Sequence, residues 1–265
     1  MKKYLVVGNP IAHSLSPKLH NIWLKENNID AKYEKTKLDI DEIESLINNI
    51  KQKKIAGCNV TVPYKKTVIP YLDKLSLEAE QTQSVNTITF DGNDLVGHNT
   101  DIFGFTMAIE SLDFTIKNKN ILILGAGSVV PSIIFALLKL KIKKIFISNR
   151  TLKKAILIKD KFNLLEIVEW GKIKKSDLFI NCTSVGLKKN DNFRLDFNNF
   201  EESNIFYDVI YNPPKTTFLI EAEKNGHKIF NGRDMFLYQA QKAFNLWHNL
   251  TPKIDKKLIN YLYDD

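Results

Sequence analysis

Two serines near the start of the chain are spaced so that both hydroxyl groups could bind one anion. Ser14 and Ser16 lie one residue apart in the segment Gly8-Asn-Pro-Ile-Ala-His-Ser-Leu-Ser-Pro17, and a tight turn would direct both hydroxyls at one ligand. Neutral donors suffice when the ligand is small and the site is already formed. Alternatively, Ser16 caps a helix that begins at Pro17, because proline is favoured in a first helical turn.

Further polar residues follow in the next part of the chain. Asn59 and Thr61 alternate along a predicted strand, so they lie on one face and could bind a ring hydroxyl together. Lys65 comes directly after, and by position alone it is one of many solvated lysines. Asp101 stands at the start of a predicted helix, where a carboxylate commonly acts as a cap and contributes about 1 kcal/mol.

A glycine turn between an apolar strand and a helix predicts a dinucleotide-binding site. The segment 120–124 runs into Gly125, Ala126, Gly127 and Ser128. Gly125 permits a tight turn, and Gly127 lets backbone amides approach a pyrophosphate whose charge the helix N-terminus stabilises. Val130 occupies the third glycine position of the motif, so wider packing is expected there. A glycine turn without a ligand is the alternative.

The end of the following strand indicates which dinucleotide is bound. The segment Ser148-Asn-Arg-Thr151 has no Asp or Glu, which an NAD enzyme usually places there for the ribose 2′-hydroxyl. Arg150 offers a planar fork for a 2′-phosphate, with Asn149, Thr151 and Lys154 as further donors. NADP is therefore the predicted cofactor. The alternative is that Arg150 caps a helix start on the surface.

Short strands alternate with helices along the chain, which is typical of parallel α/β sheets. The predicted strands are 4–7, 33–38, 57–62, 86–90, 121–124, 144–148, 178–181 and 205–209. The predicted helices are 17–27, 41–50, 102–112, 129–140, 152–160, 216–225, 234–249 and 252–263.

The length of 265 residues favours two domains. The predicted fold class is α/β. Residues 1–101 plus 235–265 form an N-terminal α/β substrate-binding catalytic domain, and residues 102–234 form a Rossmann-like, doubly wound NADP-binding domain. We expect an active-site cleft between them, with helix 102–112 and the turn before Met235 as the hinge connections.

The net charge of +8 comes almost entirely from lysines scattered through the predicted elements, since the chain has only three arginines. This pattern indicates solvated faces and favours anionic small molecules over nucleic acid. No apolar run approaches the roughly 20 residues that span a bilayer, and no signal segment is recognised, so a cytoplasmic protein is expected. Cys58 and Cys182 have no metal or redox spacing, which indicates a reducing compartment and buried thiols.

Several polar motifs, taken together, closely resemble the shikimate dehydrogenase family. They are the serine segment 8–17, Asn59-Val-Thr-Val-Pro-Tyr-Lys65, Ser84-Val-Asn-Thr87, Gly97-His-Asn-Thr-Asp101, Asn181-Cys-Thr-Ser-Val-Gly186, Asp208-Val-Ile-Tyr-Asn-Pro213, Gln239 and Ala243-Phe-Asn-Leu-Trp-His248. They follow one another in order over nearly the whole chain. The glycine turn and the segment Asn231-Gly-Arg-Asp-Met235 depart from the usual family pattern.

The resemblance implies roles for individual residues. Lys65 and Asp101 form the catalytic pair. Ser14 and Ser16 bind the substrate carboxylate with Tyr211 nearby. The ring hydroxyls are bound by Asn59, Thr61, Asn86 and Gln239, and Gly232 lies near the nicotinamide.

The implied reaction is NADP-dependent reduction of the C3 ketone of 3-dehydroshikimate to shikimate, in which Lys65 donates the proton and Asp101 orients it. A quinate/shikimate dehydrogenase that uses NAD or NADP is the nearest alternative. A non-catalytic dinucleotide-binding regulatory protein is the other. The small substrate is the expected partner, and no nucleic acid, membrane or metal is expected. The protein is expected to be a monomer or a homodimer.

Overall fold

The structure, a computed structural model, describes residues 1–162, 164–188, 191, 193, 195, 200–201 and 204–263. It divides into two compact units: unit 1 is Met1–Gly104 with Leu237–Asp265, and unit 2 is Phe105–Phe236. Both limits fall inside helices, α4 (Asp101–Glu110) and α8 (Arg233–His248). The second limit lies inside α8, close to the turn before Met235 where a hinge was expected, and the predicted domain bounds stay a prediction. The predicted cleft stays a prediction.

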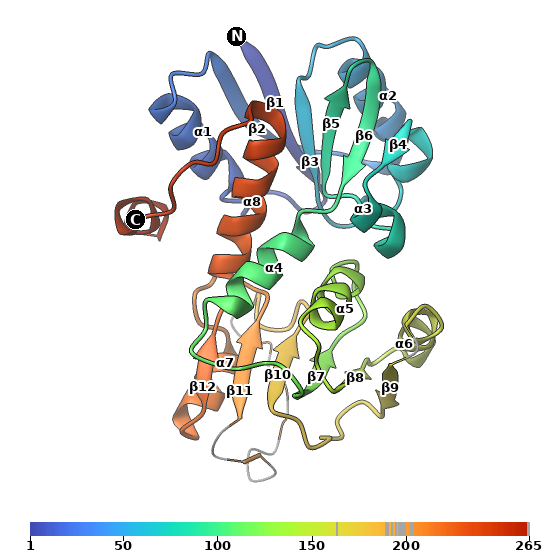
Figure 1. Ribbon diagram of the computed structural model, residues 1–265, viewed down its shortest axis with the longest axis vertical. Coiled ribbons are helices and arrows are strands. Elements are labelled where there is room, and N and C mark those ends of the chain that lie inside the picture. Colours follow the sequence, from blue (N-terminus) through green and yellow to red (C-terminus); the bar gives the residue numbers. More distant parts are fainter. Residues whose placement is uncertain are drawn as a thin grey trace. The chain divides into compact units, whose positions relative to one another are not determined.

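Unit 1 contains a mixed sheet with the strand order β2-β1-β3-β5-β6-β4 (Figure 1). Its strands are β1 (Lys2–Gly8), β2 (Ala31–Lys37), β3 (Gly57–Val60), β4 (Lys74–Leu75), β5 (Thr87–Asp91) and β6 (Asp94–His98). β5 runs antiparallel to both of its neighbours, which differs from the parallel sheet predicted. The cause is a β5–β6 hairpin closed by Gly92 and Asn93, with Gly92 at φ 61°. This dipeptide is a hairpin signal.

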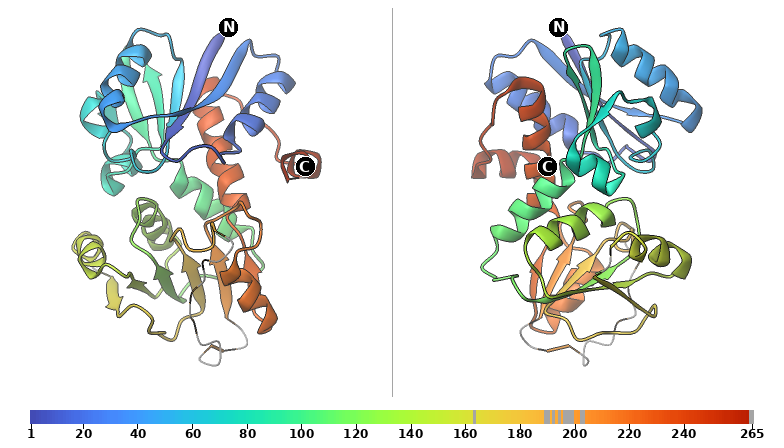
Figure 2. Two further views of the ribbon diagram at one scale, coloured as in Figure 1. Left: turned by 180° about the vertical axis from the view of Figure 1, so that it is seen from behind. Right: turned by 45° about the vertical axis from the view of Figure 1, so that its right-hand side comes forward.

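Side chains alternate between the two faces of the unit 1 sheet, and each face packs against its own apolar layer. Leu5 and Val7 face a core that includes α2, while Tyr4 and Tyr33 face the aromatic side chains of α1 and α8. Figure 2 shows α2 on one side of the sheet and α1 with α8 on the other. The helices of this unit are α1 (Ser16–Glu26), α2 (Ile43–Lys51), α3 (Leu77–Thr82), α9 (Lys256–Tyr263) and most of α8.

Unit 2 contains a parallel sheet with the strand order β12-β11-β10-β7-β8-β9. Its strands are β7 (Asn120–Leu124), β8 (Lys144–Ser148), β9 (Leu165–Val168), β10 (Leu178–Asn181), β11 (Ile205–Asp208) and β12 (Lys228–Phe230). Its own helices are α5 (Val130–Lys139), α6 (Leu152–Lys159) and α7 (Thr217–Lys224). This order is that of doubly wound dinucleotide-binding folds and reverses between β7 and β10, where such folds bind their ligand.

The sequence did not predict the short strands β4, β9 and β12, the hairpin strand β6, or helix α3. Edge strands and a six-residue helix carry too little periodic pattern to separate them from loops. Leu77–Thr82 forms a helix because the Ser76 hydroxyl accepts a hydrogen bond from Ala79 N and caps its first turn.

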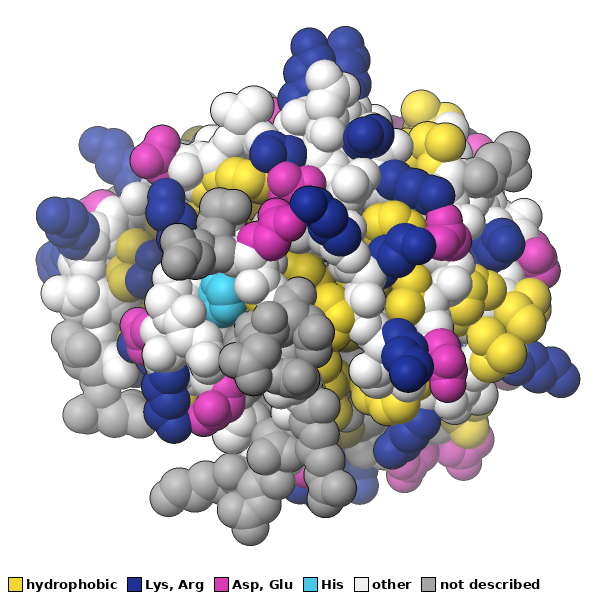
Figure 3. Space-filling view, turned by 90° about the horizontal axis from the view of Figure 1, so that it is seen from below, with side chains coloured by type: hydrophobic (Ala, Val, Ile, Leu, Met, Phe, Trp, Pro, Cys, Tyr) yellow, Lys and Arg dark blue, Asp and Glu magenta, His cyan; other side chains and the backbone are white. Residues whose placement is uncertain are grey.

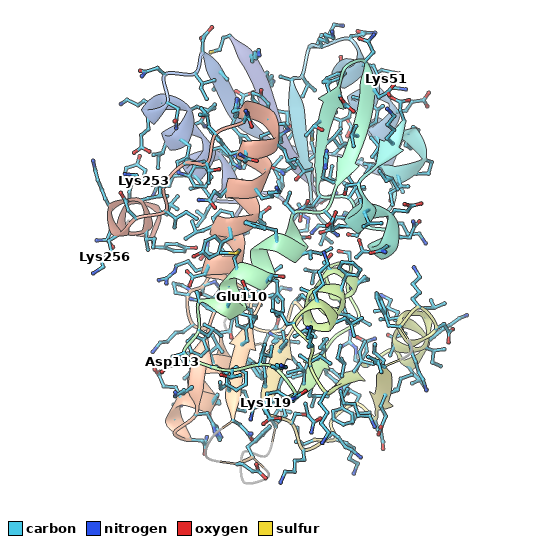
Figure 4. The ribbon with its side chains drawn as sticks, viewed as in Figure 1. Lys51, Glu110, Asp113, Lys119, Lys253 and Lys256 are labelled. Carbon is cyan, nitrogen blue, oxygen red and sulfur yellow. The ribbon has the colours of Figure 1, made fainter. Side chains whose placement is uncertain are left out.

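The surface charge is dispersed. In Figure 3, Lys and Arg side chains are interspersed with Asp and Glu on the face drawn. The labelled side chains of Lys51, Lys253 and Lys256 in Figure 4 project outward and are exposed. This agrees with the predicted solvated faces. Among the described residues, no helix combines the length and apolar character that crossing a bilayer requires.

Candidate active site

Lys65 and Asp101 form a buried ion pair at one edge of the unit 1 sheet. Lys65 is 7% exposed and Asp101 is 5% exposed, and Lys65 Nζ donates a hydrogen bond to Asp101 Oδ2. Lys65 follows β3, and Asp101 is the first residue of α4. Burial of two charges is tolerated because each neutralises the other. Asp101 is thus placed at a helix start as predicted, and its carboxylate binds Lys65 as the resemblance implies.

Asn86 and Gln239 lie beside this pair. Asn86 Nδ2 donates to Asp101 Oδ1 at 2.9 Å, and Gln239 Oε1 lies 3.5 Å from the same nitrogen. The backbone N–H of Thr100 donates to Asn86 Oδ1 at 2.8 Å, which fixes how the Asn86 amide is oriented. The sequence analysis did not identify Thr100, although it belongs to the motif that ends at Asp101.

The sheet explains why residues so far apart in sequence meet here. β1 and β3 are parallel, so the segments that follow them leave the same edge, where Asn9 N donates to Val62 O at 3.0 Å. β5 is antiparallel to β3 and to β6, so the start of β5 and the end of β6 lie at that edge as well. Asn86 and Asp101 flank these two strand ends. Ligands of α/β sheets commonly bind outside such an edge.

The serine segment does not form the helix cap that was considered as an alternative. α1 begins at Ser16, its N-cap is Leu15, and no side chain caps it. Ser14 Oγ instead accepts the Ser16 backbone N–H at 3.3 Å, while Ser16 is buried and Ser14 half-buried. Lys35 Nζ donates to Ala12 O and so holds the segment from β2. The two hydroxyls remain candidates for carboxylate binding.

Asn59 does not have the free donors that the prediction required. Its Oδ1 accepts the Tyr33 hydroxyl at 2.6 Å, and its Nδ2 donates to Asn86 O at 3.1 Å and to Thr87 Oγ1 at 2.9 Å. Both amide protons are therefore used inside the protein. Thr61 lies one residue beyond β3, is half-buried and packs its methyl group over Gly8. Binding of a ring hydroxyl by these two side chains together stays a prediction.

The glycine turn of unit 2 fits a pyrophosphate. Gly125 has φ 111°, and a Cβ there would lie 2.9 Å from Thr183 Cγ2, so the turn follows β7 closely against the segment after β10. No side chain caps α5, whose N-terminus follows the turn directly. Ser128 Oγ is buried and has no hydrogen-bond partner among the described residues. Ala126 and Gly127 lie between them and leave the backbone accessible.

The end of β8 presents exposed donors. Arg150, Thr151 and Lys154 are exposed, and Thr151 is the N-cap residue of α6 without a side-chain cap hydrogen bond. Asn149 Nδ2 donates to Thr151 O at 2.8 Å, which stabilises the turn. Arg150 is therefore not the N-cap of α6. This set of donors fits a phosphate ester at the strand end.

Tyr211 and Gly232 also belong to unit 2, and their predicted roles stay predictions. The Tyr211 ring stacks on Phe236 with 4.4 Å between centroids. A Cβ on Gly232 would lie 2.1 Å from Val209 O, so close packing of two backbone segments by itself requires glycine there.

Two family models match the chain. Residues 6–88 match "Shikimate dehydrogenase substrate binding domain", and residues 106–194 match "Shikimate / quinate 5-dehydrogenase". A protein of Pelagibacter ubique (strain HTCC1062) named Shikimate dehydrogenase (NADP(+)) is 54% identical over 98% of both chains. A protein of Caldicellulosiruptor saccharolyticus (strain ATCC 43494 / DSM 8903 / Tp8T 6331) with the same name is 39% identical over 94% of this chain and 93% of its own.

Solved structures match over a similar extent. The crystal structure of shikimate dehydrogenase from Aquifex aeolicus has a TM-score of 0.92 and 34% identity, and covers 100% of this chain and 98% of its own. The enzyme from Thermus thermophilus in complex with NADP(H) and shikimate has a TM-score of 0.88 and 30% identity over 99% and 97%. With relatives this similar over almost its full length, the chain belongs to the shikimate dehydrogenase family.

Proposed function

We propose that this protein is a shikimate dehydrogenase, an NADP-dependent oxidoreductase that interconverts 3-dehydroshikimate and shikimate in aromatic amino-acid biosynthesis. The observation that carries the proposal is the buried Lys65–Asp101 pair, with Asn86 and Gln239 beside it at one sheet edge. The names of the relatives and the complex of the Thermus thermophilus enzyme with NADP(H) and shikimate support the substrate and the cofactor.

The catalytic pair of unit 1 then has a defined role in the reaction. NADPH, when bound, supplies the hydride that reduces the C3 ketone. Lys65 Nζ donates a proton to the resulting alkoxide oxygen, and in the reverse direction accepts the proton of the shikimate hydroxyl. Asp101 holds the ammonium group in place through its Oδ2 and binds a substrate hydroxyl. Because the Lys65 ammonium group is shielded from water, its attraction for the developing alkoxide oxygen is strong.

The remaining contacts follow from the types of donor that the sheet edge presents. Ser14 and Ser16 bind the substrate carboxylate, and Thr61, Asn86 and Gln239 bind ring hydroxyls. Asn59 is not assigned to a ring hydroxyl because, unlike Asn86, it has no hydrogen bond to the Lys65–Asp101 pair among the described residues.

NADP is bound by unit 2. The segment Gly125–Ser128 and the start of α5 hold the pyrophosphate, and the buried Ser128 hydroxyl gains its missing partner from a phosphate oxygen. Arg150, with Asn149, Thr151 and Lys154, binds the 2′-phosphate. Gly232 lies near the nicotinamide.

A location in the cytoplasm and a monomeric or homodimeric state complete the proposal. Cys58 and Cys182 are free and buried, and burial raises the pKa of both thiols, so they stay protonated and unreactive at neutral pH. This is the behaviour of structural cysteines in a reducing compartment.

The test is the absorbance change at 340 nm when purified protein is mixed with shikimate and either NADP or NAD. We expect shikimate-dependent NADPH formation, faster than NADH formation. Comparable activity on quinate would favour the broader quinate/shikimate dehydrogenase. Folded protein without activity on either substrate would overturn the proposal and favour a regulatory dinucleotide-binding protein.

A further inference from the structure

A buried tyrosine stands behind the active site at the end of a line of hydrogen bonds. Tyr33 on β2 is 2% exposed, and its hydroxyl lies 2.6 Å from Asn59 Oδ1. Its ring stacks on His20 with 4.2 Å between centroids and an interplanar angle of 3°. Burial lowers the pKa of His20 to about 3, so this ring stays neutral and the stack is unaffected by pH near neutrality. The Tyr33 hydroxyl is thus held in one place.

The backbone fixes the direction of each hydrogen bond at Asn59. Asn59 Nδ2 lies 3.1 Å from Asn86 O, and a carbonyl oxygen can only accept. The amide oxygen therefore faces Tyr33, whose hydroxyl must donate. The second amide proton goes to Thr87 Oγ1 at 2.9 Å. Thr87 is fully buried, and after accepting this bond its hydroxyl has one proton to donate.

The same reasoning applies at Asn86. The backbone N–H of Thr100 can only donate, and it donates to Asn86 Oδ1 at 2.8 Å. Thr87 Oγ1 lies 3.1 Å from the same oxygen and so supplies a second donor. Nδ2 of Asn86 consequently faces Asp101 Oδ1 at 2.9 Å. Each group therefore donates to the next, from the Tyr33 hydroxyl through Asn59, Thr87 and Asn86 to the carboxylate of Asp101, which holds Lys65.

We propose that Tyr33 is a positioning residue for the Lys65–Asp101 pair, an inference that rests on the proposed function. Its hydroxyl holds the Asn59 amide so that Asn59 donates to Thr87 and Thr87 donates to Asn86. Asn86 then donates one N–H to Asp101 Oδ1, while its other N–H goes to Thr100 Oγ1 at 2.9 Å. Hydrogen bonds in a buried chain polarise one another, so a missing first donor weakens those that follow. Without it, Asn59 Oδ1 becomes a buried acceptor with no donor among the described residues.

The experiment compares Tyr33→Phe with Tyr64→Phe. Tyr64 is as buried as Tyr33, and its hydroxyl donates to Leu38 O, outside this line. Both variants lose one buried hydroxyl, so both should be less resistant to urea. Only Tyr33→Phe should lower kcat for shikimate oxidation, by about two- to tenfold, which corresponds to the net contribution of one hydrogen bond. The KM for NADP should stay within about twofold of the wild-type value.

Thr87 provides the second readout and a conservative rescue. Thr87→Val should lower kcat at least as much as Tyr33→Phe does, and Thr87→Ser, which keeps the hydroxyl, should restore it to within about twofold of the wild type. In the double variant Tyr33→Phe/Thr87→Val, the two losses should not multiply, because both interrupt one line.

The outcomes separate the inference from the function on which it rests. An active wild type with unchanged kcat in folded Tyr33→Phe, or multiplied losses in the double variant, would overturn the inference alone. If Tyr33→Phe does not fold, equal kcat values for Thr87→Val and Thr87→Ser would overturn it. A wild type without shikimate-dependent activity would overturn both the function and the inference.

Discussion

Replacing Lys65 by methionine separates the role of its ammonium group in catalysis from its role in folding. Methionine keeps an apolar stem of similar length in a position that is 7% exposed, and it leaves the Asp101 carboxylate without its cation. Removing one partner of a buried ion pair destabilises a protein by about 3–5 kcal/mol. Asp101 keeps the N–H of Asn86 at 2.9 Å, so we expect the lower end, about 3 kcal/mol. Turnover should fall by about 100-fold or more, because the general acid is gone.

Two further variants complete the design, with urea unfolding and the 340 nm assay as measurements. In Lys65→Met/Asp101→Asn both charges are removed, and the new amide oxygen can still accept from Asn86. Stability should therefore return to within about 1 kcal/mol of the wild type while turnover stays low. Lys119→Met breaks the ion pair with Asp177, whose side chains are 39% and 33% exposed. It should lower stability by less than about 1 kcal/mol and leave turnover unchanged.

The reasoning has two separate points of failure. Turnover of Lys65→Met within about threefold of the wild type would remove the ammonium group from the mechanism. If the single and double variants were equally stable, the Asp101 carboxylate would not be an uncompensated buried charge. A large loss of turnover in Lys119→Met would show that the assay reports general damage rather than loss of the proton donor.

Three more outcomes are expected. Arg150→Ala should raise the KM for NADP about tenfold or more in initial-rate assays, since charge-assisted hydrogen bonds contribute roughly 1.5–3 kcal/mol; equal losses with NAD would contradict 2′-phosphate binding. Burial raises the pKa of Asp208 from 3.8 to about 6, so its ionisation opposes folding above about pH 6 and this penalty disappears toward pH 4. In paired urea titrations, the unfolding free energy of the wild type minus that of Asp208→Asn should therefore rise by about 2–3 kcal/mol from pH 7 to pH 4, and a flat difference would argue against the raised pKa. A Cβ on Gly57 would lie 2.4 Å from Trp247 Nε1, so Gly57→Ala should lower stability by about 1–3 kcal/mol and change tryptophan fluorescence; an unchanged protein would mean that Trp247 moves freely.

Sequence patterns predicted the four inner strands of unit 2, β7, β8, β10 and β11, because these strands are continuous apolar runs, while the two edge strands were missed. The turn at Gly125 follows β7 as expected, and the strand order places it at the point where such folds bind nucleotides. The hairpin of β5 and β6 was missed although Gly92 and Asn93 signalled it, since alternation with helices was taken to mean a wholly parallel sheet. A local pattern does not determine the direction of the neighbouring strand.

The candidate site was predictable only in part from individual residues. Asp101 was placed correctly at a helix start, but its partner Lys65 is separated from it by 36 positions and by three strands, so only the motif resemblance connected them. The alternation of Asn59 and Thr61 gave a plausible shared face. It could not reveal that Tyr33, on another strand, already takes up the Asn59 amide oxygen. The folded sheet decides which donors and acceptors are already paired, and the sequence pattern alone does not show this pairing.

The composition of unit 1 from both ends of the chain has a consequence for its synthesis on the ribosome. The sheet of residues 1–104 is translated before unit 2, but Trp247 and Phe244 of α8, which cover its aromatic side, are translated only after unit 2. Unit 2 is contiguous and can fold while the C-terminal segment is still being made. Strands β1 and β2 must therefore remain incompletely covered until α8 has been translated, a delay that a circular permutant joining α8 directly to β1 would abolish.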